Sequence, residues 1–267
     1  MLSDNQAGPA RPAFPYIGGK RFLARTIIAA IAETPHELYA EPFVGAGGVF
    51  LRRPEPAKVE VINDRSRDVA TFFRVLQRHE QAFLDMLKWQ LTSRADFERL
   101  LRTDPDTLTD LERAARFLYL QRTGIGAKID GRNFGVTRTT GARFNLGRLV
   151  PIIEEVHQRL SRVVIECLNY DAFILRYDRP GALFYLDPPY YGCENYYGRG
   201  LFSRDDFESL AEALRQLRGR FLMSINDVPA IREIFAGFTL REVNVLYTAG
   251  QANHSEASEL LISGPAA

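Results

Sequence analysis

Hydrophobic positions recur at two different spacings along this chain, and they divide it into three parts. The first part predicts a helix over residues 21–33, strands over 38–44 and 58–62, and a brief helix at 49–53 between the two strands. The second part has helical spacing throughout, over residues 68–91, 95–101 and 108–121. Strands that alternate with helices are typical of an α/β sheet, so the long helical stretch is expected to be an insertion into one.

Strand patterns return in the third part, after a helix predicted over residues 150–160. Further strands are predicted over 163–168, 182–186 and 221–225, with helices over 204–217 and 229–235, and the runs 238–246 and 260–263 are expected to close the sheet as an antiparallel pair. The expected fold class is therefore α/β, a doubly wound Rossmann-like sheet with an inserted, mainly helical domain. We expect a flexible tail at residues 1–13, a main domain formed by 14–65 and 156–267, and the inserted domain at 66–155.

Composition indicates a folded globular protein. The chain has 267 residues, of which 46% are hydrophobic and 25% charged, both close to globular averages. No apolar run approaches the roughly 18 to 20 residues that span a bilayer, and the first residues lack a signal-peptide pattern, so we expect a cytoplasmic protein with no membrane partner. Cys167 and Cys193 lie far apart without the spacing of metal ligands, so free thiols and no metal site are expected.

Charge is distributed unevenly, although the whole chain carries only +1. Between Arg113 and Arg148 there are eight basic residues and one acid, Asp130, so this segment carries +7 and the rest of the chain −6. A segment of this kind can follow a phosphate backbone, or it can be a solvated arginine-rich surface, and charge alone leaves both open. Residues 123–149 also contain six glycines and little periodicity, which favours functional loops.

A glycine-rich turn follows the first predicted strand, with the sequence EPFVGAGG over Glu41–Gly48. Such a turn lets backbone amides approach a ligand closely. Phe50 stands where a dinucleotide fingerprint has its last glycine, so a single nucleoside is favoured over a pyrophosphate. Asp64 ends the second predicted strand, 19 residues after Gly45, where an acid can accept hydrogen bonds from ribose hydroxyls. Taken singly, each feature is also compatible with ordinary turn chemistry.

The strand predicted over 182–186 leads directly into Asp187-Pro188-Pro189-Tyr190. The carboxyl ends of strands are where open α/β sheets bind substrates, and two successive prolines restrict the backbone. The Asp187 carboxylate and the Pro188 carbonyl then form two acceptors for one planar amine, and Tyr190 offers a face on which a base can stack. An exocyclic amine on a heteroaromatic ring fits this arrangement, and it can attack an electrophilic methyl group. A turn with a core-facing tyrosine is the simpler alternative.

Four motifs in order, FPYIGGK at 14–20, EPFVGAGG, Asn63-Asp64 and DPPY, resemble the Dam-type DNA adenine-N6 methyltransferases, which use S-adenosylmethionine. The resemblance implies that Asp187, Pro188, Pro189 and Tyr190 are catalytic. It implies that Phe43 to Gly48 wrap the methionine part of the cofactor, that Asp64 binds its ribose and that Asp171 contacts its adenine. Glu41, where the family more often has Asp, is expected to neutralise the amino group. The full cofactor set implied is Tyr16, Lys20, Glu41, Phe43, Gly45, Gly47, Asp64, Asp171 and Asp187.

The same resemblance implies that residues 66–155 form the target-recognition domain and that double-stranded DNA is the partner. The candidate DNA-binding residues are Arg122, Lys128, Arg132, Asn133, Arg138 and Arg143. The family usually has an Asn-Arg pair followed by Asn-Gly-Leu, whereas this chain has Gln121-Arg122-Thr123-Gly124, so GATC recognition is not carried over. The stretch GAKIDGRNFGV is similar to phage and prophage members of the family, which implies the cytoplasm of a bacterial or phage-infected cell.

The expected reaction is direct methyl transfer to an adenine that has been flipped out of the duplex. Cytosine-C5 methylation is excluded, because it needs a nucleophilic Cys in a Pro-Cys pair, and Cys167 follows Glu166 while Cys193 follows Gly192. Three alternatives remain open from the residues alone: a cytosine-N4 methyltransferase, an RNA or protein methyltransferase, and a non-catalytic DNA-binding protein.

Overall fold

A seven-stranded sheet forms the centre of the computed structural model, which describes residues 8–16, 20, 23–126, 129, 131–135, 141–194, 200–246 and 256–265. The strands are β1 (Leu38–Glu41), β2 (Val59–Asn63), β3 (Val164–Glu166), β4 (Ala182–Leu186), β5 (Arg220–Asn226), β6 (Phe238–Leu246) and β7 (Glu256–Pro265). Their order in the sheet is β3-β2-β1-β4-β5-β7-β6. Strands β1 to β5 pair in parallel, and β7 pairs antiparallel with both β5 and β6. The predicted doubly wound sheet with an antiparallel closing pair is therefore confirmed.

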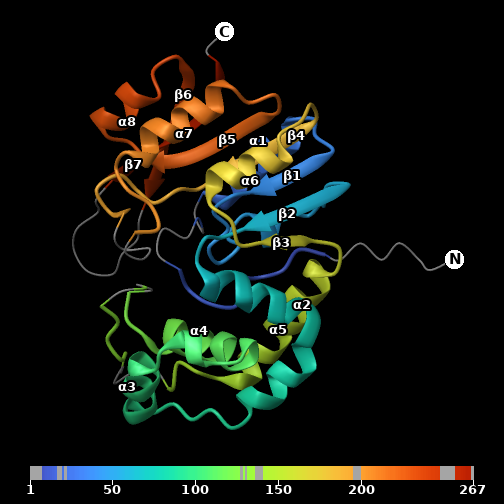
Figure 1. The fold of residues 1–267 in the computed structure, drawn as a ribbon, viewed down its shortest axis with the longest axis vertical. Coiled ribbons are helices and arrows are strands. Elements are labelled where there is room, and N and C mark those ends of the chain that lie inside the picture. Colours follow the sequence, from blue (N-terminus) through green and yellow to red (C-terminus); the bar gives the residue numbers. More distant parts are fainter. Residues whose placement is uncertain are drawn as a thin grey trace, which may run out of the picture.

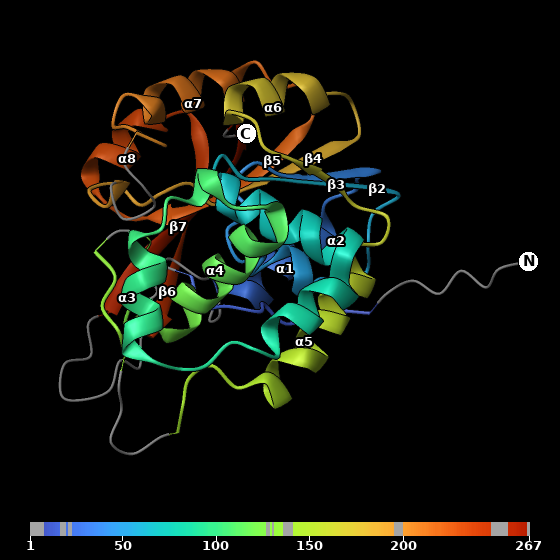
Figure 2. The same ribbon diagram turned by 60° about the horizontal axis from the view of Figure 1, so that its bottom comes forward.

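Helices cover both faces of this sheet (Figures 1 and 2). They are α1 (Ala24–Glu33), α2 (Arg67–Leu87), α3 (Arg94–Arg102), α4 (Asp110–Thr123), α5 (Leu146–Leu160), α6 (Tyr170–Tyr177), α7 (Asp206–Arg215) and α8 (Pro229–Ile234), with short 3₁₀ helices at Phe50–Arg52 and Pro105–Thr107. Figure 2 shows α6 and α7 above the sheet, and α1, α2, α4 and α5 below it. Within the described ranges, no helix has the length and apolar character needed to cross a bilayer.

Most predicted elements are present, with differences at their ends. Strand β4 and strand β6 have the predicted bounds. Helix α5 begins four residues before its predicted start, because the Asn145 side chain accepts a hydrogen bond from the Arg148 amide and caps it there. Helix α6 was not predicted, because its eight residues are too few to show helical periodicity. Its Phe173 and Ile174 are buried in a hydrophobic cluster with residues of the sheet.

The strand order places an open crevice at the carboxyl ends of β1 and β4. From β1 the chain continues outward to β2 and β3, whereas from β4 it continues outward in the opposite direction to β5. Loops that leave two neighbouring strands in opposite directions separate, and α/β proteins bind ligands at this point of the sheet. The glycine-rich turn follows β1 and the DPPY sequence follows β4, so the topology brings both motifs to the crevice.

The helices between β2 and β3 do not enclose a core of their own. One hydrophobic cluster contains Tyr39 and Leu183 of the sheet together with Phe72 of α2 and Phe117 of α4. Phe14 joins them, with its ring centroid 5.1 Å from that of Phe72 and 5.0 Å from that of Phe117. The segment predicted as an inserted domain thus packs directly against the sheet.

Two of the predicted domain boundaries fall within continuous structure. Residue 155 lies inside α5, which continues to Leu160, and Arg159 near its end forms a buried ion pair with Glu60 of β2. Residues 10–13 of the predicted tail are packed, since Ala10 and Ala13 are buried and the Ala10 amide donates to the Leu51 carbonyl across 2.7 Å. Residues 1–7 lie outside the described part of the chain.

Candidate active site

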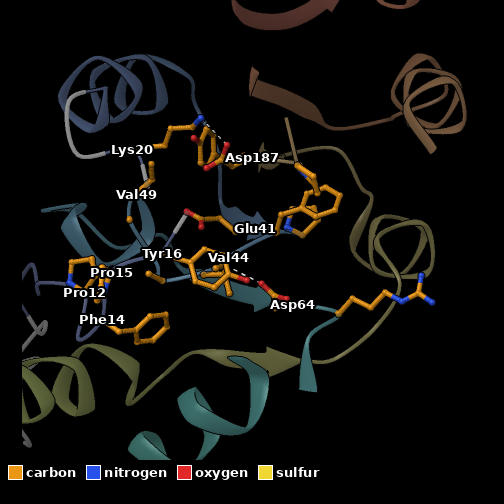
Figure 3. A pocket seen from close by; sticks show the side chains of 18 of the residues that line it. Pro12, Phe14, Pro15, Tyr16, Lys20, Glu41, Val44, Val49, Asp64 and Asp187 are labelled. Carbon is orange, nitrogen blue, oxygen red and sulfur yellow. Dashed lines mark hydrogen bonds and ion pairs between the residues drawn. The ribbon is translucent and has the colours of Figure 1, made fainter. Parts of the chain in front are cut away.

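A pocket of about 720 Å³ opens at the carboxyl ends of β1, β2 and β4 (Figure 3). Its lining includes eight of the predicted catalytic and cofactor residues: Tyr16, Lys20, Glu41, Phe43, Gly45, Asp64, Asp187 and Pro189. These residues come from four separate motifs, the last of them more than a hundred positions after the first three. The fold therefore assembles the four motifs into one site.

The glycine-rich turn is shaped by Gly45 and Gly47, which have φ angles of +51° and +72°. A Cβ on Gly45 would lie 3.0 Å from the Tyr16 ring, so glycine also permits the close approach of that ring. A Cβ on Gly47 would lie 2.9 Å from Leu51, underneath the turn. In the described structure Gly47 shapes the turn but does not line the pocket, and its cofactor contact stays a prediction.

Asp64 holds the glycine-rich turn from the end of β2. Its Oδ2 accepts a hydrogen bond from the Gly45 amide at 3.0 Å, and its Oδ1 accepts one from the Ser66 amide at 2.8 Å. Burial raises the pKa of Asp64 to about 6, and the two amide hydrogen bonds oppose that rise. Asp64 is thus an ionised acceptor at the pocket wall above that pH.

Aromatic rings form another wall of the pocket. Phe43, Tyr170 and Phe202 pack mutually, with centroid separations of 5.6, 5.7 and 5.8 Å. Tyr170 and Phe202 were not predicted as site residues, because nothing in their local sequence distinguishes them from core aromatics. Asp171 was predicted instead of its neighbour Tyr170, but its side chain is exposed at the start of α6 and lies outside the lining in the described structure. Helix α6 turns Tyr170 toward the pocket and Asp171 away from it.

Glu41 is buried, with 2% of its surface exposed, yet it lines the pocket. Burial raises the pKa of Glu41 to about 8, although the Tyr39 hydroxyl donates a hydrogen bond to its Oε1 across 2.6 Å. The Arg53 guanidinium packs over the Tyr39 ring, 3.7 Å from its centroid, and so helps to hold the Tyr39 hydroxyl in place. At neutral pH the isolated protein therefore holds Glu41 mainly in its protonated form, and a cation in the pocket would favour ionisation.

Lys20 and Asp187 face each other at the other end of the pocket (Figure 3). The Lys20 Nζ lies 2.9 Å from Asp187 Oδ1, and the Ser224 hydroxyl donates to the same oxygen at 3.4 Å. Burial raises the pKa of Asp187 to about 6, while the Lys20 ammonium lowers it. The Asp187 carboxylate keeps 22% of its side-chain surface exposed, so at neutral pH it is an ionised acceptor that reaches the pocket.

Tyr190 contacts Lys20 through both its hydroxyl and its ring. Lys20 Nζ donates to the Tyr190 hydroxyl at 2.6 Å, and it also lies 4.4 Å from the ring centroid. Tyr190 in turn donates to Glu259 of β7, a buried residue that the motifs did not indicate. In the described structure Pro189 lines the pocket but Pro188 and Tyr190 do not, and one face of the Tyr190 ring is covered by the ammonium. Lys20, predicted as a cofactor residue, is thus bound mainly to catalytic-motif side chains.

A second groove, of about 1230 Å³, adjoins the pocket, and Pro15 and Arg122 line both. Arg143 and the exposed Arg148 also line it. Arg143 donates to the Gly124 carbonyl at 3.0 Å, next to an antiparallel bridge between Gly124 and Phe134. The groove therefore carries three arginines of the basic segment, Arg122, Arg143 and Arg148.

The remaining members of the basic segment divide into three groups. Arg113 and Arg116 are buried against Asp68 between α2 and α4, so they stabilise the helices and do not contribute to an exposed basic surface. Arg132 is buried as well, whereas Asn133 is exposed. Lys128 and Arg138 lie outside the described residues. The exposed positive charge is therefore smaller than the sequence count suggested.

Comparisons with known proteins agree with this arrangement. The sequence model of the D12 class N6 adenine-specific DNA methyltransferases matches residues 16–249. The type II methyltransferase M1.LlaDCHI of Lactococcus lactis subsp. cremoris is 25% identical over 95% of each chain. A DNA adenine methylase of Vibrio cholerae is 26% identical over 94% of this chain and 95% of its own, and the type II methyltransferase M.CviBI of Paramecium bursaria Chlorella virus NC1A is 23% identical over 78% and 80%. The chain belongs to the D12 class N6 adenine-specific DNA methyltransferases, and it methylates the exocyclic amine of adenine in DNA.

Proposed function

We propose that the methyl donor is S-adenosylmethionine and that the Asp187 carboxylate receives the amine of an adenine flipped out of duplex DNA. The observation that carries the proposal is that Asp187, Glu41 and Asp64 line one pocket. Glu41 suits the ammonium group of such a ligand and Asp64 suits its ribose, while Asp187 lies beside the expected reaction centre.

The residues present fit this donor in their chemistry. Glu41 would pair with its ammonium, Asp64 would accept its ribose hydroxyls, and the rings of Phe43, Tyr170 and Phe202 would contact its adenine. Because Gly45 has no side chain, its backbone stays accessible at a point where a Cβ would contact the Tyr16 ring. When bound, S-adenosylmethionine supplies an electrophilic methyl carbon on a sulfonium.

Asp187 would act by accepting a hydrogen bond from the adenine amine, with the Pro188 carbonyl as the predicted second acceptor. Hydrogen bonds to both N–H groups make the nitrogen lone pair more available to the methyl carbon. The amine nitrogen would take the methyl group, with sulfur keeping the bonding electron pair, and Asp187 would receive the proton that the amine loses and pass it to solvent. Alignment of nitrogen, carbon and sulfur supplies most of the rate.

DNA would bind along the groove that adjoins the pocket. Arg122, Arg143 and Arg148 would pair with phosphates there, and the shared boundary at Pro15 and Arg122 allows a strand in the groove to deliver a base into the pocket. Extruding the base costs a few kcal/mol, which contacts in the pocket must offset. We propose that the helical segment 66–155, which supplies most of the groove, selects the target sequence.

The proposal is tested by transfer of a labelled methyl group from S-adenosylmethionine to DNA. Asp187→Ala should lose at least about a thousandfold in turnover while S-adenosylmethionine binding, measured by calorimetry, stays within about fivefold. Asp171→Ala is the matched control, because that aspartate is exposed and outside the pocket, and it should resemble wild type. Substantial turnover by Asp187→Ala would overturn the proposed role, and a large loss of binding by Asp171→Ala would overturn the proposed cofactor position.

A further inference from the structure

We propose that Glu259 is a positioning residue of the active site. Its carboxylate anchors Tyr190 and competes with the Asp187 carboxylate for the Lys20 ammonium. The inference rests on the proposed function of Asp187. Glu259 lies on β7, 72 residues after Asp187, and belongs to none of the four motifs.

Each oxygen of the Glu259 carboxylate has a different partner in the site. Oε2 accepts from Lys20 Nζ at 3.0 Å, and Oε1 accepts from the Tyr190 hydroxyl. The side chains of Lys20 and Glu259 are only 2% and 3% exposed. A buried charge is tolerated when it is paired and hydrogen-bonded, so this geometry fixes the ammonium instead of leaving it to solvent.

The sheet register explains how a distant residue reaches the site. Glu259 pairs with Asn226 of β5 in the antiparallel ladder. The Asn226 side chain accepts from the Tyr191 amide at 2.9 Å and donates to the Tyr191 carbonyl at 3.1 Å. Asn226 and Glu259 therefore hold two successive residues of the DPPY loop, Tyr191 by its backbone and Tyr190 by its hydroxyl.

The charges around Asp187 give Glu259 a specific consequence. Asp187 is faced by Lys20 from the N-terminal segment, Ser224 from β5, Tyr185 from β4, Glu41 from β1 and Glu259 from β7. The negative charge of Glu259 raises the pKa of Asp187, and the Lys20 ammonium lowers it. If Glu259 lost its charge, Asp187 would be the one carboxylate paired with the Lys20 ammonium in these contacts, and it would stay ionised to lower pH.

The test is the pH profile of kcat/KM for Glu259→Gln. We expect its acid limb to move to lower pH by about half a unit or more, and kcat to fall about tenfold because Tyr190 and Lys20 lose an anchor. Glu259→Asp keeps the charge and should keep the wild-type limb. Glu242→Gln is the matched control on the neighbouring strand β6, where the side chain is exposed and pairs with Arg232, and it should match wild type throughout.

A purely structural role for Glu259 would lower activity without moving the limb, and that result would overturn the inference. Should Glu259→Gln fail to fold, Tyr190→Phe provides an independent test. This substitution removes the hydroxyl that donates to the Glu259 carboxylate, so that carboxylate should attract the Lys20 ammonium more strongly and away from Asp187. The acid limb should then move to higher pH, and an unmoved limb would overturn the inference. Retained turnover by Asp187→Ala would instead remove the proposed function and this inference together.

Discussion

Asn63 and the backbone of Leu168 exchange two hydrogen bonds across the carboxyl edge of the sheet. The Asn63 amide donates to the Leu168 carbonyl at 3.1 Å, and its oxygen accepts from the Leu168 amide at 2.8 Å. The same amide also donates to the Pro42 carbonyl at 2.9 Å. One buried side chain at the end of β2 therefore holds the segments after β1 and β3, which contribute Pro42 and Leu168 to the pocket lining.

Asn63→Asp should destabilise the protein and weaken donor binding, because a carboxylate cannot donate to the two carbonyls. A buried polar group left without its partner costs about 1–3 kcal/mol, which urea denaturation would detect. Asn169→Asp is the control, since Asn169 is exposed and its side chain does not cap α6. Equal stability of Asn63→Asp and wild type would contradict the role of Asn63.

Donor binding should release protons at pH 7. The pKa of Glu41 is about 8 in the free protein, so the group is mainly protonated, and the ammonium of the bound donor lowers that pKa. Calorimetry in buffers of different ionisation enthalpy would measure the release, and affinity should rise as pH increases from 6 to about 8. Glu41→Gln should abolish both effects. Proton uptake, or release that persists in Glu41→Gln, would argue against the assignment.

Gly45→Ala should both destabilise the fold and weaken donor binding. An alanine in the left-handed region costs about 1–2 kcal/mol, and its Cβ would lie 3.0 Å from the Tyr16 ring. Gly181→Ala separates the two effects, because Gly181 has a φ of +81° with nothing within 4 Å of the added Cβ. The control should lose similar stability in thermal unfolding but bind the donor normally. Normal binding by Gly45→Ala would contradict the proposed place of the turn.

Arg148→Ala should weaken DNA binding and reduce its dependence on salt. Removing one phosphate contact lowers the slope of log K against log salt by about 1. Arg25→Ala, an exposed arginine on α1 away from the groove, should leave the slope unchanged. The measurement is DNA affinity across a salt series, and identical slopes for wild type and Arg148→Ala would remove Arg148 from the DNA interface.

Motif residues that end a strand or directly follow one could be predicted from the sequence. Glu41, Asp64 and Asp187 reach one pocket because parallel strands present their carboxyl ends at the same edge. The central strands of the sheet could be predicted for a similar reason, since β4 is a continuous apolar run bounded by turn residues.

Residues that reach the site through tertiary pairing could not be predicted. Glu259 arrives through the antiparallel register of β7 with β5, and Phe202 packs against Phe207 of α7 with ring centroids 4.9 Å apart. The charge pattern failed at Arg113 for a related reason: its partners Asp68 and Asp106 lie 45 and 7 residues earlier, and the fold brings them to it. A count of charges along the chain contains no information about such pairs.

The central claim is tested most directly by single-nucleotide mapping of modified bases in mixed-sequence DNA after incubation with S-adenosylmethionine. We predict N6-methyladenine at a defined sequence context with the wild-type protein, and unmodified DNA with Asp187→Ala. Methylation at cytosine, or the same adenine pattern with Asp187→Ala, would contradict the account.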